Sequence, residues 1–191
     1  MSFWLSYRNR LLGALDQVEV LGRGDDLLSI DEGLDLACSL VDDVAKQGSE
    51  IFFIGNGASA AFASHMAADW TKHGRIPSRC FTDLSLLTAT ANDFSFEEVF
   101  ERSLRTFVRP GSLLVTISSS GGSPNIIRAA QAARELEIPI IGFSGFSPDN
   151  ASRSLSDLSF YVPDDSYGTV ECIHQVLLHA WLDCFVEKHP R

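Results

Sequence analysis

The sequence predicts an α/β protein: a three-layer αβα sandwich around a five-stranded parallel sheet, with N-terminal helices added. Two observations support this prediction. Short apolar runs that suit buried strands alternate with segments of helical periodicity, which is the pattern of a parallel sheet covered on both faces. In addition, a strand, a Gly/Ser-rich loop and a helix follow one another twice, first at Ile51 and again at Leu113. The 191 residues suit one domain, with residues 1–48 as an extension and residues 49–191 as a doubly wound core.

The N-terminal extension is expected to form two helices, over residues 3–21 and 26–47, because apolar side chains recur there at steps of three and four. The first helix is conspicuously apolar for a peripheral element, since it carries Phe3, Trp4 and Tyr7. It either covers one side of the core or packs on a second subunit. An apolar face of this size would be unusual on a monomer, so we predict a homo-oligomer, most simply a homotetramer built through these helices.

The core is expected to alternate strands and helices after Gly48. Strands are predicted at residues 51–54, 78–82, 113–117, 139–143 and 158–162, and helices after Ser59 and at 84–91, 96–107, 126–136 and 170–186, with a short helical turn near Ala151. In a doubly wound sheet, ligands bind at the carboxyl ends of the strands where the winding direction reverses. We therefore expect the two Gly/Ser-rich loops to lie side by side there.

Charge and composition exclude several classes of function. The net charge of −10 argues against a nucleic-acid surface, and any anionic ligand must be held by local dipoles and hydroxyls. No stretch approaches ~20 apolar residues, so no membrane span or membrane partner is expected. The start of the chain lacks the pattern of a cleavable signal peptide. The four cysteines are scattered without a C-x-x-C pair. A reduced, cytoplasmic protein is expected.

The two loops have the composition of a phosphate site. Residues 55–59 read Gly-Asn-Gly-Ala-Ser between a strand and a helix, where backbone N–H groups and the helix dipole favour an anion. Residues 118–123 read Ser-Ser-Ser-Gly-Gly-Ser and add hydroxyl donors. A flexible linker is the alternative, but the position between a buried strand and a helix disfavours it. Neither the triphosphate-binding nor the dinucleotide-binding glycine pattern is present, so no nucleotide cofactor is expected.

His65 and Asp69 are the first candidates for chemistry. Their i,i+4 spacing places both on one face of the helix that leaves the first loop. The pair could serve as an acid and a base or as metal ligands, while a lone surface histidine is the alternative.

These motifs resemble a known family. GNGASAAFASHMAADW and ISSSGGSPNIIRAA are similar to the sugar isomerase (SIS) superfamily, and within it to the phosphoheptose isomerases, which interconvert sedoheptulose 7-phosphate and D-glycero-D-manno-heptose 7-phosphate. The resemblance covers nearly the whole chain, including residues 91–94 and 171–179. It implies the flavodoxin-like SIS fold, proton transfer through an enediol, and one zinc ion at each active site.

The resemblance also implies roles for individual residues. Phosphate binding would fall to Ser118, Ser119, Ser120 and Ser123, and the rest of the substrate would meet Asn56, Gly57, Ser59, Asp93 and Glu171. Asp69 and His179 would be catalytic, and His65, Asp69, Glu171 and His179 would bind zinc. Glu171 and His179 are eight residues apart, about 12 Å along a helix. They reach one metal only if their side chains converge, if Glu171 lies at a frayed helix start, or if they come from different subunits.

The chain departs from the family pattern at several of these positions. Asp69 stands where Glu is usual, Glu171 where Gln is usual, His73 where Arg is common, and Gly168-Thr169 where Asp-Arg is usual. Two readings therefore stay open beside the heptose isomerase: isomerisation of a different phosphosugar, and a non-catalytic SIS protein that binds a phosphosugar or a protein partner as a regulator.

Overall fold

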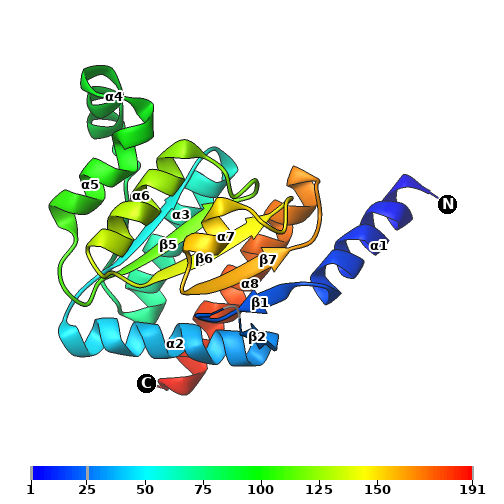
Figure 1. Cartoon of the computed structure of the whole chain (residues 1–191). Coiled ribbons are helices and arrows are strands. Elements are labelled where there is room, and N and C mark those ends of the chain that lie inside the picture. Colours follow the sequence, from blue (N-terminus) through cyan, green and yellow to red (C-terminus); the bar gives the residue numbers. More distant parts are fainter. Residues whose placement is uncertain (1, 25, 191) are drawn as a thin grey trace.

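The computed structural model describes residues 2–24 and 26–190, which form a three-layer αβα sandwich as expected (Figure 1). Five strands are parallel: β3 (Ile51–Gly55), β4 (Ser78–Cys80), β5 (Leu113–Ser118), β6 (Ile140–Gly145) and β7 (Leu158–Val162). The strand order is β2-β1-β7-β6-β5-β3-β4. The chain winds from β3 to β4 in one direction and from β5 to β7 in the other, so the winding reverses between β3 and β5. The predicted count of five strands is wrong, because two antiparallel strands extend the sheet to seven.

The two additional strands lie in the N-terminal extension, where only helices were expected. The first helix, α1 (Phe3–Asp16), ends before β1 (Glu19–Leu21), and β2 (Leu27–Leu28) precedes α2 (Ile30–Gln47). β1 pairs antiparallel with both β2 and β7. Without β1, the edge of β7 would present unpaired backbone groups, which explains why this short segment is drawn into the sheet.

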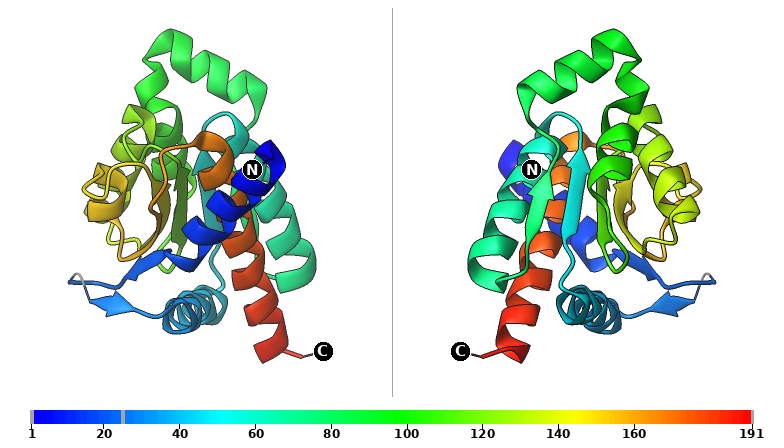
Figure 2. Two further views of the ribbon diagram at one scale, coloured as in Figure 1. Left: turned by 90° about the vertical axis from the view of Figure 1, so that its right-hand side faces the viewer. Right: turned by 90° about the vertical axis from the view of Figure 1, so that its left-hand side faces the viewer.

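Two helical layers cover the sheet (Figure 2). On one face, α2, α3 (Ala58–Asp69) and α8 (Tyr167–Lys188) pack on a core that includes Phe53, Val115 and Phe143. On the other face, α5 (Val99–Phe107) and α6 (Pro124–Glu135) pack on Phe52 and Ile54. Neighbouring strand residues thus enter opposite cores, which is why the central strands are continuous apolar runs.

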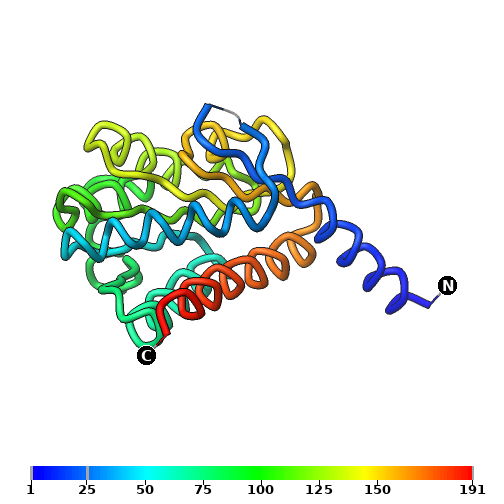
Figure 3. The backbone as a smooth tube through the Cα atoms, turned by 90° about the horizontal axis from the view of Figure 1, so that it is seen from below, coloured from blue at the N-terminus to red at the C-terminus, as the bar shows by residue number. Residues whose placement is uncertain are grey.

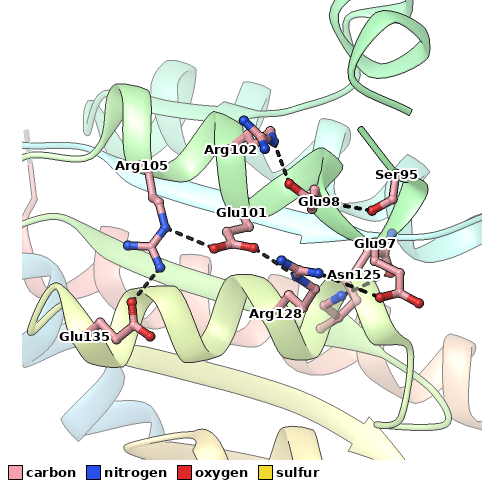
Figure 4. Close-up of polar contacts among 10 residues, drawn as sticks. Ser95, Glu97, Glu98, Glu101, Arg102, Arg105, Asn125, Arg128 and Glu135 are labelled. Carbon is pink, nitrogen blue, oxygen red and sulfur yellow. Dashed lines mark hydrogen bonds and ion pairs between the residues drawn. The ribbon is translucent and has the colours of Figure 1, made fainter. Parts of the chain in front are cut away.

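α5 and α6 are also joined by a row of ion pairs (Figure 4). The Glu101 carboxylate accepts hydrogen bonds from Arg105 Nε at 3.0 Å and from Arg128 Nε at 2.9 Å, and Arg105 Nη2 donates to Glu135 at 2.5 Å. The arginine side chains are 39–41% exposed, so each pair contributes little stability. The row links α5 to α6 at the surface, while the apolar core beneath them holds the two helices on the sheet.

Two helices stand away from this body. α1 projects from the side of the sandwich (Figures 1 and 3), and α4 (Leu84–Asp93) projects beyond the 3₁₀ turn η2 (Phe96–Glu98) that leads into α5. Phe3 and Trp4 on α1 are 83% and 65% exposed. Arg10 anchors α1 to the segment before α8, with Nε 2.7 Å from Asp164 Oδ2. The exposed apolar residues agree with the motivation for the predicted oligomer, which stays a prediction.

Candidate active site

The two Gly/Ser-rich loops meet at the carboxyl ends of β3 and β5, where the sequence predicted them to meet. Together with the start of α8 they enclose a cavity of about 220 Å³. The lining includes Asn56, Gly57, Ser59, Ser118, Ser119, Ser120, Ser123, Tyr167 and Glu171. Eight of the nine residues expected to contact the substrate are therefore brought to one place, the exception being Asp93.

The backbone of the first loop requires glycine at the position that precedes α3. Gly57 has φ 55° and ψ −123°, a conformation that residues with a Cβ rarely adopt. This turn directs the chain from the end of β3 into α3 and leaves the N-terminal N–H groups of α3 beside the cavity. Such a helix start favours an anion.

A reciprocal amide pair joins the two loops. Asn56 Nδ2 donates to Asn125 Oδ1 at 2.9 Å, and Asn125 Nδ2 donates to Asn56 Oδ1 at 2.9 Å. Asn125 Oδ1 also accepts from the backbone N–H of Ile126 at 3.0 Å. Asn125 therefore holds Asn56 and the start of α6 together. Sequence reasoning missed Asn125, whose only signal was its place in the first turn of the helix after the serine loop.

The serine loop offers a donor without a protein partner. The Ser119 side chain is buried, and its Oγ has no hydrogen-bond partner among the described residues. A buried hydroxyl without a hydrogen-bond partner destabilises the fold unless a ligand or a water molecule forms a hydrogen bond with it. No lysine or arginine is among the described residues that line this cavity. A phosphate here would be held by hydroxyls, backbone N–H groups and helix dipoles, as the acidic composition led us to expect.

A second cluster lies further along α3 and α8. His65, Asp69 and His179 each place a potential ligand atom within 4.8 Å of the others. His65 Nε2 is 3.4 Å from Asp69 Oδ2, and the rings of His65 and His179 meet edge-on with centroids 5.2 Å apart. The helix spacing predicted the first pair, and the packing of α3 on α8 adds His179.

Two tryptophans fix the helices beside this cluster. Trp70 follows Asp69 and opens the π-helical turn η1 (Trp70–Gly74), and Trp181 lies two residues after His179. Both indoles are fully buried, with ring centroids 4.6 Å apart. Because each tryptophan is adjacent or nearly adjacent to a cluster residue, their packing sets the separation of Asp69 and His179. π-Turns of this kind are frequent at functional sites.

The cluster fits a zinc ion by its donor set. Two imidazoles and one carboxylate are a common set of protein ligands in catalytic zinc sites, which keep a further position for water or substrate. His65 and Asp69 side chains are 49% and 22% exposed, so the cluster is open to solvent on one side. The three residues would hold the ion and leave a position free.

Glu171 and Asp93 do not join this cluster. Glu171 lines the phosphate cavity, two helical turns from His179, so the single chain does not bring it to the place of a fourth metal ligand. Asp93 is exposed at the end of the projecting helix α4, where its Oδ1 accepts from Asn92 Nδ2 at 2.9 Å. The single chain does not bring Asp93 to the cavity either.

His174 is separate from both clusters. Its side chain is fully buried, and Nε2 lies 3.1 Å from the backbone oxygen of Ser144 in β6. That carbonyl can only accept, so Nε2 carries the proton, and Nδ1 has no partner among the described residues. His174 is therefore a structural residue that ties α8 to β6.

The fold and the site are those of a phosphosugar-binding α/β class, and comparisons with known proteins agree. The family model described as SIS domain matches residues 28–145. A phosphoheptose isomerase of Bordetella avium is 36% identical over 163 residues, covering 81% of this chain and 83% of that protein. The solved phosphoheptose isomerase of Neisseria gonorrhoeae superposes with a TM-score of 0.82 at 31% identity, over 95% of this chain and 96% of that one.

The chain belongs to the SIS domain family, in its phosphoheptose isomerase branch. It is an enzyme of the isomerase class. A more distant solved relative, the Vibrio vulnificus NanR protein, shares the fold at 18% identity and a TM-score of 0.66. Within the described residues, no helix has the length and apolar character needed to cross a membrane.

Proposed function

We propose that this chain is a metal-assisted aldose–ketose isomerase that converts sedoheptulose 7-phosphate to D-glycero-D-manno-heptose 7-phosphate. The observation that carries the proposal is the pairing of two sites on the same two helices. α3 and α8 line the phosphate cavity at their N-termini and bring His65, Asp69 and His179 together further along. Relatives named phosphoheptose isomerase at 31–38% identity support the choice of reaction.

The spacing of the two sites supports a long substrate. Ser59 lines the cavity and His65 belongs to the cluster, six residues later on α3, which is about 9 Å along the helix. An extended seven-carbon chain with its phosphoester spans roughly 10 Å, at about 1.3 Å of axial length per bond. A heptose phosphate held by phosphate in the cavity would therefore reach the cluster with its carbonyl end.

The residues of the cluster suit proton transfer between adjacent carbons. Isomerisation removes a proton from the carbon next to the carbonyl and returns one to the former carbonyl carbon, through an enediol. Asp69 and His179 are the two groups we assign to these transfers, since a carboxylate and an imidazole both act as general acids and bases near neutral pH. A zinc ion held by His65, Asp69 and His179 would supply a Lewis acid for the substrate oxygen.

At the other end, the chain's own residues bind and orient the phosphate. The hydroxyls of Ser118, Ser119, Ser120 and Ser123 and the N-termini of α3 and α6 are assigned to the phosphate oxygens. Glu171 is assigned to a sugar hydroxyl, because its carboxylate lies on the cavity wall and outside the three-residue cluster. Asp93 would contact substrate only through a partner subunit, in keeping with the predicted homotetramer. A cytoplasmic location, suggested by four free cysteines, remains part of this proposal.

The direct experiment is NMR of sedoheptulose 7-phosphate incubated with the zinc-loaded protein. We expect appearance of the aldose signals. His179→Gln should lower the rate by about 10²–10⁴ with phosphosugar affinity nearly unchanged, the usual effect of removing one acid/base group. His65→Ala should lose bound zinc as well as activity. His73→Gln, a matched change on an exposed histidine of η1, should keep the parental rate. Parental turnover by both Asp69→Asn and His179→Gln would contradict the assignment.

One specific observation favours a second candidate function, a phosphosugar-binding regulator without catalysis. The carboxylate at position 69 is the shorter Asp, and Glu171 stands outside the cluster, so a metal would have one protein ligand fewer than the family pattern implies. The same NMR experiment separates the two candidates. If the zinc-loaded parent protein shows no turnover but sedoheptulose 7-phosphate still raises its unfolding temperature, the regulator replaces the isomerase.

A test of the phosphate assignment is independent of turnover. Ser120→Asp places a negative charge in the cavity and should abolish protection of the protein by phosphosugar against thermal unfolding. Thr88→Asp, on the exposed face of α4, is the matched control and should keep that protection. Full protection of the Ser120→Asp variant would show that the serine loop is not the phosphate site.

A further inference from the structure

A second hollow lies at the amino-terminal ends of the parallel strands, at the end of the sheet opposite to the first cavity. It is formed by the β1–β2 turn, the end of α6, the short helix α7 (Ala151–Leu155) and the start of β7. Its volume is about 220 Å³. Three arginines from three different segments line it: Arg23, Arg134 and Arg153. This concentration of guanidinium groups is notable in a chain with a net charge of −10.

Two of these arginines share one carboxylate oxygen. Asp157 Oδ1 accepts from Arg23 Nη2 at 2.8 Å and from Arg134 Nη1 at 3.1 Å, while Asp157 Oδ2 accepts from the backbone N–H of Ile140 at 2.9 Å. Two positive charges thus face one negative charge. A guanidinium has five N–H donors. Arg134 donates to Asp157 through Nη1 only, so its other N–H groups remain available for a further anion.

The third arginine is the most buried of the set. The Arg153 side chain is 10% exposed, its Nη2 donates to Glu19 at 2.6 Å, and its guanidinium lies 4.4 Å from the centre of the Tyr161 ring. These contacts hold the group rigidly on one wall of the hollow. Counting the residues just described, three arginines face two carboxylates, which leaves one positive charge.

A buried hydroxyl at the hollow lacks a hydrogen-bond partner. Ser159 in β7 is 2% exposed and lines the hollow, and its Oγ has no hydrogen-bond partner among the described residues. A buried O–H without a partner is unfavourable unless a ligand or water accepts its proton. Ser159 thus supplies a donor beside the arginines, the combination that recognises an oxyanion.

We propose that this hollow binds the phosphate group of a small phosphorylated metabolite, at a site separate from the cavity between the loops. A neighbouring hollow of about 330 Å³ shares Arg23 and Arg134 with the first, and its other lining residues are Glu137, Ile138, Pro139 and Asp157. It has room for the remainder of such a molecule. The two phosphate sites lie at opposite ends of the parallel strands, because Ser159 is near the start of β7 and Ser118 is at the end of β5.

The test uses inorganic phosphate as the probe and equilibrium dialysis of the full-length protein as the measurement. The Ser120→Asp variant, which blocks the cavity between the loops, should retain one saturable phosphate site. Adding Arg134→Gln should weaken that site by roughly tenfold or more, because a hydrogen bond to a charged group is lost. Adding Ser159→Ala instead should weaken it too, without disturbing the fold, since that hydroxyl bonds to no described residue.

Arg105→Gln in the Ser120→Asp background is the matched control. Arg105 carries the same charge and belongs to the ion-pair row between α5 and α6 (Figure 4), so its loss should leave phosphate binding unchanged. Three results would each overturn the proposal: no saturable site in Ser120→Asp, unaltered binding after both Arg134→Gln and Ser159→Ala, or an equal loss in Arg105→Gln. The last would mean that general charge, and not this hollow, attracts phosphate.

Discussion

Acid should destabilise this protein through one buried histidine. Burial lowers the pKa of His174 to about 4, against an ordinary value near 6.5, because the charged imidazolium would lose its hydration. As the pH falls below about 6.5, the unfolded chain takes up a proton at this position and the folded chain does not. The stability that His174 provides is therefore complete above about pH 6.5 and is lost as the pH falls towards 4.

The size of the effect follows from the difference between the two pKa values. With the folded value at about 4, the full loss is about 3 kcal/mol, and about 2 kcal/mol of it has occurred by pH ~5. A typical domain is stable by only ~5–15 kcal/mol. Acidification to pH ~5 should therefore remove a measurable share of the free energy of unfolding.

Urea denaturation of the parent protein and of His174→Gln at about pH 7 and about pH 5 gives the measurement. Glutamine can donate to the Ser144 carbonyl but does not titrate. All other titrating groups are the same in the two proteins, so their contributions cancel when the two pH dependences of the free energy of unfolding are compared. The variant should be less stable at neutral pH, since its amide oxygen is buried. Its free energy of unfolding should fall by about 2 kcal/mol less than the parent's on acidification. Parallel pH dependences of the two proteins would refute the reasoning.

Three further predictions concern packing, capping and assembly. Gly33→Ala should destabilise the protein by about 1–3 kcal/mol in denaturant titrations, because the added Cβ would lie 2.5 Å from Val20 Cγ1. Gly13→Ala is the control, since a Cβ added there would have no atom within 4 Å. Ser29→Ala removes the capping box of α2 and should cost about 1 kcal/mol in the same assay. Light scattering should give a multiple of 20.9 kDa that Trp4→Glu reduces, and a monomeric mass for the parent would contradict the predicted oligomer.

The parallel part of the fold was readable from the sequence because its signals are strong. Strands buried on both faces are continuous apolar runs such as Ile51–Gly55, and each Gly/Ser-rich loop directly follows one of them. Their meeting at one edge follows from the doubly wound topology alone. Helix ends moved by a few residues, as for α8, which begins at Tyr167 and not at Val170.

The antiparallel hairpin was not readable for an equally physical reason. β1 has three residues and β2 has two, too few for an alternating pattern to be recognised. Val18 and Leu21 also extend the helical spacing of α1, so the local pattern favours helix. Pairing with β7 decides the outcome, and that is a tertiary effect outside any sequence window.

The candidate site was predicted best where local geometry determines it. His65 and Asp69 are near each other because one helix carries both, whereas the approach of His179 depends on how α3 packs on α8. Asp93 and Glu171 were transferred from a family pattern. The single chain brings Glu171 to the cavity but not to the metal cluster, and it does not bring Asp93 to the cavity. Asn125 has no motif of its own, and only the reciprocal amide pair reveals it.

That amide pair also has a bearing on how the protein ages. Asn56 is followed by glycine, the neighbour that least hinders attack of the backbone nitrogen on the side-chain amide, and asparagine is among the thermolabile residues. Deamidation to Asp would replace the donor nitrogen that faces Asn125 Oδ1 with an oxygen and add a negative charge beside the serine loop. Samples kept warm should therefore lose phosphosugar affinity while still folded. Mass spectrometry of the peptide containing residues 55–59 would measure the deamidated fraction.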